Sequence, residues 1–482
     1  SGGCTNNTYY SDVDSDNYGN ATSTTLACSQ PSGYVLNNTD CNDNNNQTYP
    51  GATEICGDGI DNNCSGGIDE GCVTGNVYYV SSTGSDTTGN GSYNNPWFSP
   101  KKAKKSTGAI QPGDTVVFKN GIYSYSGGDE CMLGYSADDS GTSNNQITYK
   151  AETRGGVTID FGCGSSGYGW RFEENFGAHN IILDGFNLVN FKLGIRIQSQ
   201  NITIKYVNLT ATPTWPPSGN VCAYAGGGGC LVTNEGSSFL IEKVIADNCS
   251  KDVSSHGIYV AGGNGTIRDS IFRNNAGNGI QIQARNSDYD IGTIFVYKNK
   301  MYGNIWRGLY ISAYSDGLQT KGGPAYGTIN AVYAYNNLIW NNAPTTFSLS
   351  CGASGTGVLN NAFIEHNTIY DGYDGIQTQG AGVYFRNNII SGMSRNYVGW
   401  NTLQDGNVVV SNNCVEGNAG YNFADQDNCV PNFVSTNPSD VNFLKLNAGS
   451  PAINNGFDVG ITTDFAGNLR VGVPDIGAYE YV

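Results

Sequence analysis

A short motif recurs along the middle of the chain and constrains its fold more than any other feature. In each copy a glycine is followed by residues that alternate in polarity, so that every second side chain of a strand points the same way. The five copies that align without gaps are LGIRIQ from Leu193, HGIYVA from His256, NGIQIQ from Asn278, RGLYIS from Arg307 and DGIQTQ from Asp374. Asparagine-centred segments accompany them, and the steps from Asn187 to Asn208 and from Asn367 to Asn388 are both 21 residues. Strands at this spacing are too frequent for helical crossovers, which indicates a coil stacked on itself.

We therefore expect an all-β chain dominated by a right-handed parallel β-helix, a solenoid similar to that of pectate lyases. Its coils should stack at about 4.8 Å, the distance between neighbouring strands, and roughly ten coils fit the repeat region. The recurring Asn residues should occupy turns, where they tolerate left-handed backbone and hydrogen-bond from coil to coil. The aliphatic residues predicted to form ladders inside the coil are Ile195, Ile197, Ile258, Val260, Ile280, Ile282, Leu309 and Ile311.

Charge and cysteine content limit the possible partners and the cellular location of the chain. The 482 residues contain 41 Asp and Glu against 24 Lys and Arg, a formal charge of -17. Such a surface repels nucleic acid, so no nucleic-acid partner is expected. No apolar run approaches the roughly 18 residues of a membrane span. Fourteen cysteines, six of them in the first 72 residues, indicate disulfides and an extracellular or cell-surface location, although the pairing stays open.

The first 72 residues show almost no apolar periodicity, so burial alone would not order them. Three loops instead place oxygen-bearing residues at alternate positions, as calcium loops do. We expect about three Ca²⁺ ions in this small, disulfide-rich, loop-dominated module. The predicted ligands are Asp12, Asp14, Asp16, the Tyr18 carbonyl and Asn20 in the first loop; Asp43, Asn45, Gln47, the Tyr49 carbonyl and Glu54 in the second; and Asp61, Asn63, Ser65, the Gly67 carbonyl and Asp69 in the third.

The order and spacing of these loops resemble the MopE-like metal-binding motif of secreted bacterial proteins. The resemblance runs from TYYSDVDSDNYGN through CNDNNNQTYPGATEICGDGIDNNCSGGIDEGC, across nearly all of residues 4 to 72. It departs from the family pattern at Asn17, Asn45 and Ser65, which should weaken the sites through lower charge. The family's name member is associated with copper, but this region contains no Trp, His or Met. Oxygen ligands without these donors favour calcium.

Two further segments frame the β-helix. The first segment predicts a strand, a short amphipathic stretch near Pro100 to Ile110, and two more strands; its sequence includes VYYVSSTGSD and IQPGDTVVFKNGIYSYSG. They resemble the first coil of parallel β-helix proteins, which include several polysaccharide lyases. The end of the chain, from NFLKLNAGS onward, resembles the closing segment of choice-of-anchor Q surface proteins and should cover the last coil. The expected domains are the module at 1–74 and the β-helix at 75–482, with an opening segment at 75–150 and a closing segment from about 430 to 482.

The repeat alignment also predicts which side chains share an outer face. One column holds the residues expected to contact glycans or proteins: Arg196, Tyr259, Gln281, Tyr310 and Gln377. Two looser repeats add Leu231 and Ser348 to this column. The residues before each glycine, including His256 and Arg307, lie beside it. Acceptor sequons at Asn20, Asn46, Asn201 and Asn264 predict N-glycosylation on an exposed surface.

Three functions fit these features, and the first is preferred. The chain could be a structural or adhesive surface protein, such as a filament or matrix subunit that binds other copies of itself or cell-surface glycans; its 31 tyrosines suit a contact surface. It could be a glycan-binding adhesin. It could be a calcium-dependent polysaccharide lyase on an acidic glycan, with Lys251, His256, Arg285 and Arg307 as base, acid and enolate stabiliser and Asp252 on calcium.

The enzyme hypothesis has less support in the sequence. No lyase-family motif is carried intact onto these positions, and the charge of -17 opposes a polyanion. A glycosidase needs two carboxylates that face one sugar. The candidate pairs Asp371/Asp374 and Glu173/Glu174 are better explained as turn and surface residues.

Overall fold

The computed structural model divides the chain into two compact units, Ser1–Asn76 and Val77–Val482. Each unit is described by itself. The residues that the structure describes are 6–52, 60–65, 75–124, 134–135, 139–162, 168–173, 178–191, 193–211, 229–249, 255–285, 290–314, 327–354, 357–379, 382–395, 408–417 and 429–482.

The N-terminal unit is a small antiparallel sheet followed by loops. Its strands lie in the order β2-β1-β3, with β1 at Asn7–Ser11, β2 at Asn20–Ala27 and β3 at Tyr34–Val35. A disulfide joins Cys41 to Cys64, and the rings of Tyr18 and Tyr49 stack with centroids 5.3 Å apart. These links between distant loops stand in for a hydrophobic core, because few side chains of this unit are buried.

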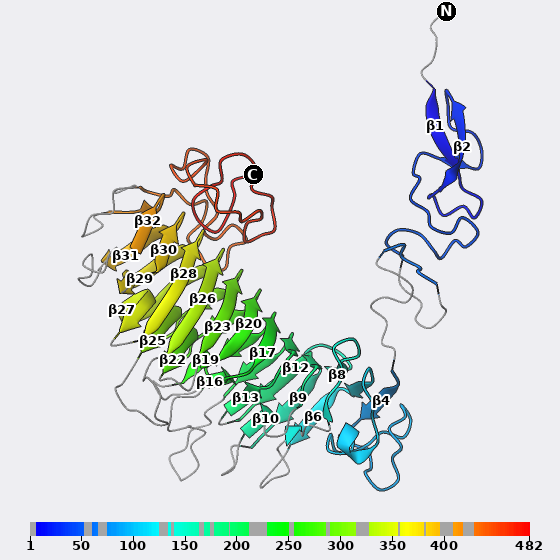
Figure 1. The fold of residues 1–482 in the computed structure, drawn as a ribbon, viewed down its shortest axis with the longest axis horizontal. Helices are drawn as coiled ribbons and strands as arrows, with labels where there is room; N and C mark the ends of the chain where they lie inside the picture. The colour runs from blue at the N-terminus through cyan, green and yellow to red at the C-terminus, as the bar shows by residue number, and fades with distance from the viewer. Residues whose placement is uncertain are drawn as a thin grey trace, which may run out of the picture. The chain divides into compact units, whose positions relative to one another are not determined.

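The second unit is a parallel β-helix, visible in Figure 1 as strands stacked in register along one axis. One of its ribbons is a twelve-stranded parallel sheet with one strand from each coil. Its members are β4 (Val77–Val80), β5 (Thr115–Phe118), β8 (Ile147–Ala151), β11 (Ile181–Asp184), β14 (Ile202–Lys205), β17 (Ser238–Glu242), β20 (Gly263–Arg268), β23 (Ile291–Tyr297), β26 (Thr328–Tyr335), β28 (Val358–Glu365), β30 (Val383–Arg386) and β32 (Val408–Ser411). Twelve coils are slightly more than the roughly ten expected.

The other two faces of each coil belong to one eighteen-stranded sheet. The second face is formed by β6 (Gly121–Ser124), β9 (Val157–Asp160), β12 (Phe186–Val189), β15 (Asn208–Thr210), β18 (Ile245–Asp247), β21 (Ile271–Arg273), β24 (Lys300–Tyr302) and β33 (Cys414–Val415). The third face is formed by β7 (Gly134–Tyr135), β10 (Tyr168–Glu173), β13 (Leu193–Gln198), β16 (Gly229–Thr233), β19 (His256–Val260), β22 (Ile280–Arg285) and β25 (Leu309–Tyr314). In later coils β27 (Leu338–Ser354), β29 (Thr368–Gln379) and β31 (Ile389–Arg395) bend through the corner as single strands.

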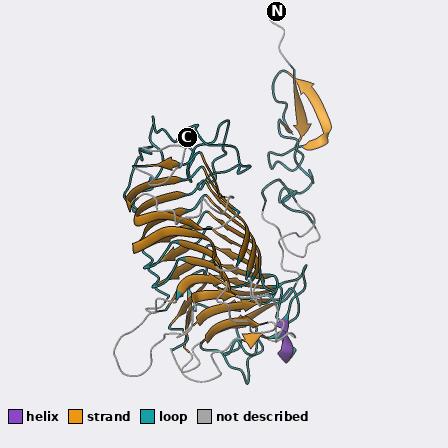
Figure 2. Ribbon diagram, turned by 60° about the vertical axis from the view of Figure 1, so that its left-hand side comes forward, coloured by secondary structure: helices purple, strands orange, loops and turns teal. Residues whose placement is uncertain are grey.

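Aliphatic ladders fill the inside of the coil, as the alternation predicted. One ladder runs through the register of β13, β16, β19, β22 and β25, and its buried members are Ile195, Leu231, Ile258, Ile280 and Leu309. Figure 2 shows the unit built almost wholly of strands and loops, with a short 3-10 helix at Lys105–Thr107 in the opening segment. The expected parallel β-helix fold is confirmed.

Two ladders of buried asparagines tie the corners of successive coils together. In the longer ladder the Oδ1 of each Asn accepts hydrogen bonds from the backbone N–H and from the Nδ2 of the Asn one coil earlier, at 2.9–3.1 Å. Each Nδ2 also donates to a backbone carbonyl. The ladders are Asn299, Asn337, Asn367, Asn388 and Asn413, and Asn275, Asn304 and Asn342. These side chains satisfy backbone groups that the turn would otherwise bury without partners.

Turn residues beside each ladder adopt left-handed backbone, which Asn tolerates better than most residues. Asn274, Asn341, Asn387 and Asn412 have φ between 47° and 57°. Asn274 and Asn341 are exposed, whereas Asn387 is buried. The predicted turn role of the recurring Asn residues is therefore correct for this set. A second set consists of the buried asparagines that form the ladders.

The C-terminal segment packs on the last coils and along one corner of the β-helix. Leu446, Ala452 and Ile476 bury against Ile389 and Cys414 of β31 and β33. The buried Arg470 pairs with Glu480 at 2.7 Å and donates to Asn336 Oδ1 at 3.0 Å. The segment thus covers the edge of the final coil, as expected, and also reaches back over earlier coils. Its likeness to choice-of-anchor Q proteins stays a prediction.

Substitution of a ladder asparagine should destabilise the β-helix strongly. Asn337→Ala removes the acceptor for Asn299 and two donated bonds, leaving several buried polar groups unsatisfied. We expect the free energy of unfolding in urea to fall by about 3 kcal/mol. Asn144→Ala, in an exposed turn, is the control and should change it by less than about 0.5 kcal/mol. An equal effect of the two substitutions would contradict the role of the ladder.

Stability should fall as the pH drops below about 6.5, the ordinary pKa of histidine. Burial, with a smaller effect from the nearby Arg470, holds the pKa of His366 well below that value. The unfolded chain therefore binds this proton first, and acid favours unfolding. His366→Gln should flatten the pH dependence of the melting temperature between pH 6.5 and 5. An unchanged slope in this variant would show that another group is responsible.

Candidate functional site

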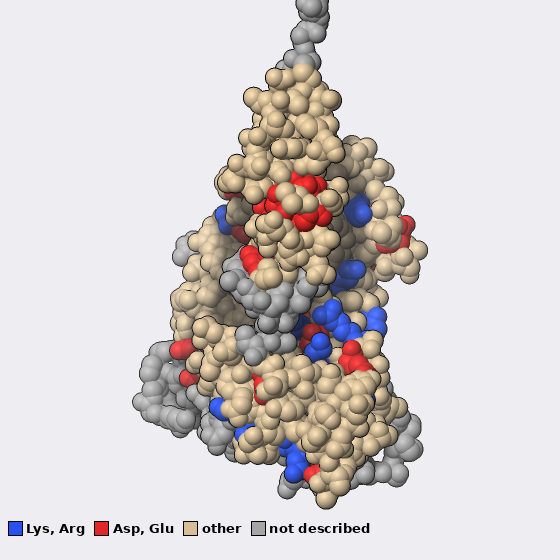
Figure 3. Space-filling model, turned by 90° about the vertical axis from the view of Figure 1, so that its right-hand side faces the viewer, with Lys and Arg blue, Asp and Glu red and all other residues tan. Residues whose placement is uncertain are grey.

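The N-terminal unit gathers carboxylates from two of the predicted loops. Ligand oxygens of Asp12, Asp14 and Asp16 lie within 4.8 Å of one another, and so do those of Asp14, Asp40 and Asp43. Figure 3 shows a concentration of acidic side chains on this unit. Residues 1–76 contain ten Asp and Glu and no Lys, Arg or His, so no cationic side chain of this unit can neutralise the cluster. Close like charges need a counter-ion to be stable.

Backbone hydrogen bonds curl the first loop around the cluster. Asp12 accepts bonds from the backbone N–H of Asp16 and of Asn17, both at 3.2 Å. Asp16 accepts one from Tyr18 at 2.8 Å. Ser15 and Asn17 take left-handed backbone, with φ of 68° and 76°. This curl brings alternate side chains to one side, the arrangement that a calcium loop uses.

Several carboxylate oxygens in the cluster are buried without partners. Both oxygens of Asp14 and one oxygen each of Asp16 and Asp40 have no hydrogen-bond partner among the described residues. Burial, with a smaller contribution from neighbouring aspartates, raises the pKa of Asp16 and of Asp40. A bound divalent cation would satisfy these oxygens and offset the repulsion between them.

The geometry joins two predicted sites that the sequence separates. Asp43, expected in the second loop, accepts a bond from the backbone N–H of Val13 at 2.8 Å and so lies against the first loop. Asp40 belongs to the same group, although the alternation pattern did not select it. The only hint in the sequence is its place three residues before Asp43.

The other predicted ligands are less well gathered. Asn45 accepts from the backbone of Gln47 and donates to Thr48, and Asn20 accepts from Thr22, which are turn contacts. In the third loop Asp61 accepts from Ser65, as Asp12 does from Asp16. Glu54, Gly67 and Asp69 lie outside the described residues.

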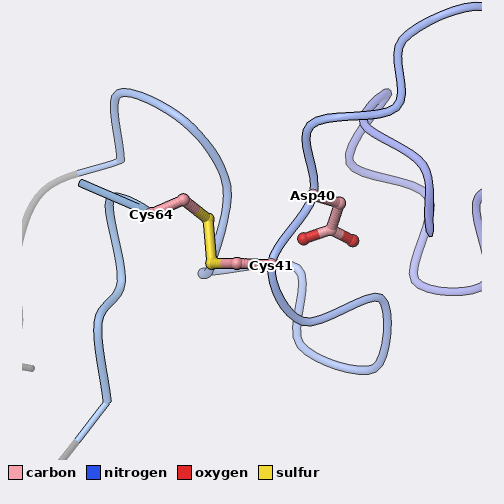
Figure 4. Close-up of side chains that lie close together, drawn as sticks. All are labelled: Asp40, Cys41 and Cys64. Carbon is pink, nitrogen blue, oxygen red and sulfur yellow. A yellow bond between two sulfur atoms is a disulfide. The ribbon is translucent and has the colours of Figure 1, made fainter. Parts of the chain in front are cut away.

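Sulfur does not add a ligand near this cluster in the described part of the unit. Figure 4 shows Asp40 beside Cys41 and Cys64, whose sulfurs are bonded to each other. A disulfide sulfur is not a thiolate and offers no strong metal bond. The donors that converge are carboxylate oxygens, a set that suits a hard cation such as calcium better than copper.

The β-helix carries a second candidate site on the outer face of its third ribbon. The register of adjacent strands places Arg196, Val232, Tyr259, Gln281 and Tyr310 in one row, across β13, β16, β19, β22 and β25. Figure 1 shows these strands side by side. The row continues through Ser350 and Gln377. The looser repeats misplaced two members: Leu231 is buried inside the coil, with Val232 in its place, and Ser350 rather than Ser348 pairs with Tyr310 and Gln377.

Hydrogen bonds fix the polar side chains at the centre of this face. His256 is buried, and its Nδ1 accepts the backbone N–H of Asn278 at 2.9 Å. Asn278 donates to Gln281 at 2.6 Å, and Gln281 donates to Gln283 at 3.1 Å. A Cβ at Gly277 would lie 2.3 Å from His256 Nδ1, so the glycine is required for this close packing. In the neutral ring the proton of His256 therefore lies on Nε2.

Aromatic side chains and one arginine flank these amides. The ring of Trp306 lies 6.4 Å from that of His256, and its side chain is 36% exposed. The Arg307 guanidinium lies over the ring of Tyr310 at 4.7 Å. Burial lowers the pKa of Arg307, and its Nε has no partner among the described residues. Trp306 and Gln283 were missed in the sequence because neither occupies the repeated column.

The structure describes the other predicted residues of this face, and the predicted glycosylation sites, to different extents. Lys251 and Asp252 lie outside the described residues, and of Arg285 and Gln377 only the backbone is described. Among the sequons, Asn46, Asn201 and Asn264 are exposed and Asn20 is partly buried. The amide of Asn201 donates to Asn180 at 2.5 Å, so glycosylation there would break a contact between coils. Their glycosylation stays a prediction.

Comparisons with known proteins support the fold and the metal motif. A family model described as "Cu-binding_MopE: Putative metal-binding motif" matches residues 40–70. The solved structure of pectate lyase Pel9A is similar over 84% of this chain and 96% of its own, with a TM-score of 0.57 at 16% identity. A rhamnogalacturonan lyase is similar over 78% and 97%, with a TM-score of 0.45 at 16% identity. The A-module of the Azotobacter vinelandii mannuronan C-5 epimerase AlgE4 is similar over 64% of this chain and 93% of its own, with a TM-score of 0.38 at 15% identity.

No curated protein matches the chain. The likeness to pectate lyase Pel9A shows the pectate-lyase-like β-helix fold, and the family model shows a metal-binding motif at residues 40–70. In the described part of the chain, no helix has the length and apolar character to cross a membrane.

Substitution of one carboxylate should distinguish a single metal site shared by the two loops from two independent sites. Asp14→Asn and Asp40→Asn should each weaken Ca²⁺ binding by about tenfold, because each removes a charged ligand. Isothermal titration of the chelator-treated full chain measures this, with CuCl₂ titrated in parallel. Asp458→Asn, an exposed acid of the C-terminal segment, is the control. Wild-type calcium affinity in Asp40→Asn would contradict the joint site, and tighter binding of copper would contradict the preference for calcium.

Proposed function

We propose that the chain is an extracellular glycan-binding protein whose β-helix presents the binding surface and whose N-terminal unit is ordered by calcium. The observation that carries the proposal is the row on the third ribbon. It combines Tyr259 and Tyr310 with Gln281, beside the exposed Trp306. We call this surface the amide–aromatic face.

The chemistry of the face suits sugars. Aromatic side chains offer apolar area to the C–H groups of a sugar ring and a polar tip to its hydroxyls. Amides both donate and accept, so the partly exposed Gln283 can bond a hydroxyl in either role, and the buried Gln281 holds it in place. Because neighbouring bonds hold these amides, little side-chain entropy is lost when a ligand binds.

The spacing of the face also suits a polymer. Adjacent rungs of the row are separated by the distance between strands, about 4.8 Å. That distance is close to the length of one sugar residue in an extended chain. A polysaccharide that runs along the axis would therefore meet one side chain of the row with each sugar.

The metal has a structural role in this proposal. The acidic cluster contains no nucleophile and no candidate base other than its own ligands. Calcium bound there would tie Asp40 and Asp43 to the first loop and order a unit that has little core. Disulfides in both units fit the proposed location outside the cell or on its surface. Self-association into a filament stays a prediction, to be checked by light scattering with and without calcium.

One observation supports a second candidate, the lyase. The guanidinium of Arg307 is desolvated and lies over the ring of Tyr310 on the outer face of a pectate-lyase-like fold. Such a cation could stabilise the enolate that forms when a base removes the proton α to the carboxylate of a uronate. Elimination creates a C=C bond, so the ultraviolet absorbance of its product measures this activity. No absorbance change on a panel of acidic polysaccharides, with calcium present, would eliminate the lyase.

Loss of the exposed tryptophan should weaken glycan binding. Trp306→Ala should reduce affinity by about tenfold, because it removes the largest exposed aromatic surface of the face. Affinity electrophoresis of the full chain in gels that contain plant, algal or bacterial polysaccharides would measure the change. Tyr93→Ala, an exposed aromatic in the opening segment, is the matched control. Equal retardation of the Trp306→Ala and wild-type proteins by every polysaccharide would contradict the proposal.

A further inference from the structure

A groove runs along the corner of the β-helix next to the amide–aromatic face. Its volume is about 550 Å³, within the range of ligand-binding pockets. It crosses five successive coils, from Asn274 to Ser394, and its lining includes Gly303, Ile305, Asn341, Asp371 and Tyr373. The proposal above does not use this surface.

The turns that line the groove form one row, in which Gly303 carries no side chain and stands between two asparagines. Asn274, Gly303, Asn341 and Asp371 occupy equivalent turn positions, with φ of 56°, 66°, 47° and 50°. A Cβ on Gly303 would lie 2.7 Å from Asn274 Oδ1. The Asn274 side chain therefore takes up the space beside Gly303, and a larger residue at 303 would have to displace it and so alter the wall of the groove.

Both polar and apolar groups line the groove. Asn274, Asn341 and Asp371 supply amide and carboxylate groups, which bond hydroxyls. Two exposed apolar side chains also line the groove: Ile305 is 51% exposed and Tyr373 is 39% exposed. A sugar ring has the matching pattern, with hydroxyls on its edge and C–H groups on its faces.

We propose that this corner groove is a second glycan-binding site, which takes uncharged sugar residues. The carboxylate of Asp371 accepts hydrogen bonds from hydroxyls but repels a uronate or a sulfate. The net charge of -17 acts in the same direction. The choice of glycan as ligand class rests on the proposed function, but the residues and the surface are different.

One short loop places neighbouring side chains on the two surfaces. The backbone N–H of Ile305 donates to Asn275 at 2.9 Å, and that of Trp306 donates to Gly277 at 3.1 Å. Ile305 lines the groove, whereas Trp306 lies by His256 on the amide–aromatic face. The two sites therefore share a rigid wall, and a branched or folded glycan could occupy both.

The test changes the wall of the groove at Gly303. Gly303→Asn installs the residue that nearby coils already carry, at a backbone conformation that Asn tolerates, and its Cβ must displace the Asn274 amide. Gly155→Asn is the control for an added Asn side chain at positive φ, since it has φ of 77° and no atom within 4 Å of its Cβ. Tyr373→Ala provides a second groove variant at an exposed position, and Tyr310→Ala tests the amide–aromatic face. Saturation-transfer NMR and calorimetry on the calcium-loaded full chain would use hexasaccharides of β-1,4-linked glucose, xylose and mannose, with hexagalacturonate as the anionic probe.

We expect at least one neutral hexasaccharide to bind and hexagalacturonate to be excluded from the groove. Gly303→Asn and Tyr373→Ala should weaken the neutral ligand by about tenfold, while Gly155→Asn leaves it unchanged. If only Tyr310→Ala weakens binding, the groove site is wrong and the proposed function stands. If only the groove variants weaken it, the groove site stands and the amide–aromatic face is wrong. No binding of any neutral probe overturns the groove site.

Discussion

The stacking of one coil on the next is the constraint on which the rest of this β-helix depends. Apolar ladders alone would let coils slip, because Ile and Leu tolerate many packings. The buried asparagines remove that freedom, since each Oδ1 accepts two bonds from the Asn one coil earlier. Outside the coil, the rings of Phe295, Tyr333, Phe363 and Tyr384 stack at 4.7–5.0 Å and follow the same register. A slip of one residue would break all of these contacts together.

Because the register of the strands is fixed, residues that repeat along the sequence lie side by side and form a continuous surface. Residues some 20 to 40 positions apart, such as Tyr259, Gln281 and Tyr310, become neighbours because their strands pair in parallel. The same register aligns the turns that line the groove. Both proposed glycan surfaces therefore depend on coil stacking, together with the short turn that carries Ile305 and Trp306. The N-terminal unit solves a different problem, because it has little to bury and must be ordered by disulfides and, in our account, by calcium.

The sequence predicted those parts of the structure that repeat. A strict alternation of residues can be seen in the sequence alone. It predicts the inward Ile and Leu, the turn asparagines and the row of Arg196, Tyr259, Gln281 and Tyr310. Leu231 was misplaced because its repeat, GCLVT, offers two apolar residues for one inward position. Asp40 could not be found, since the approach of the second loop to the first is a tertiary contact. Trp306 was missed for the same reason: it lies between repeats and reaches the face only through the fold of its turn.

The amide–aromatic face is the central claim, and hydrogen–deuterium exchange of the full chain tests it most directly. Exchange would be compared with and without a saturating polysaccharide that the chain binds, in calcium. The account predicts added protection in peptides from β19, β22 and β25 and in the turn at residues 303–308. Protection confined to residues 6–52 or to the C-terminal segment at 429–482 would contradict it.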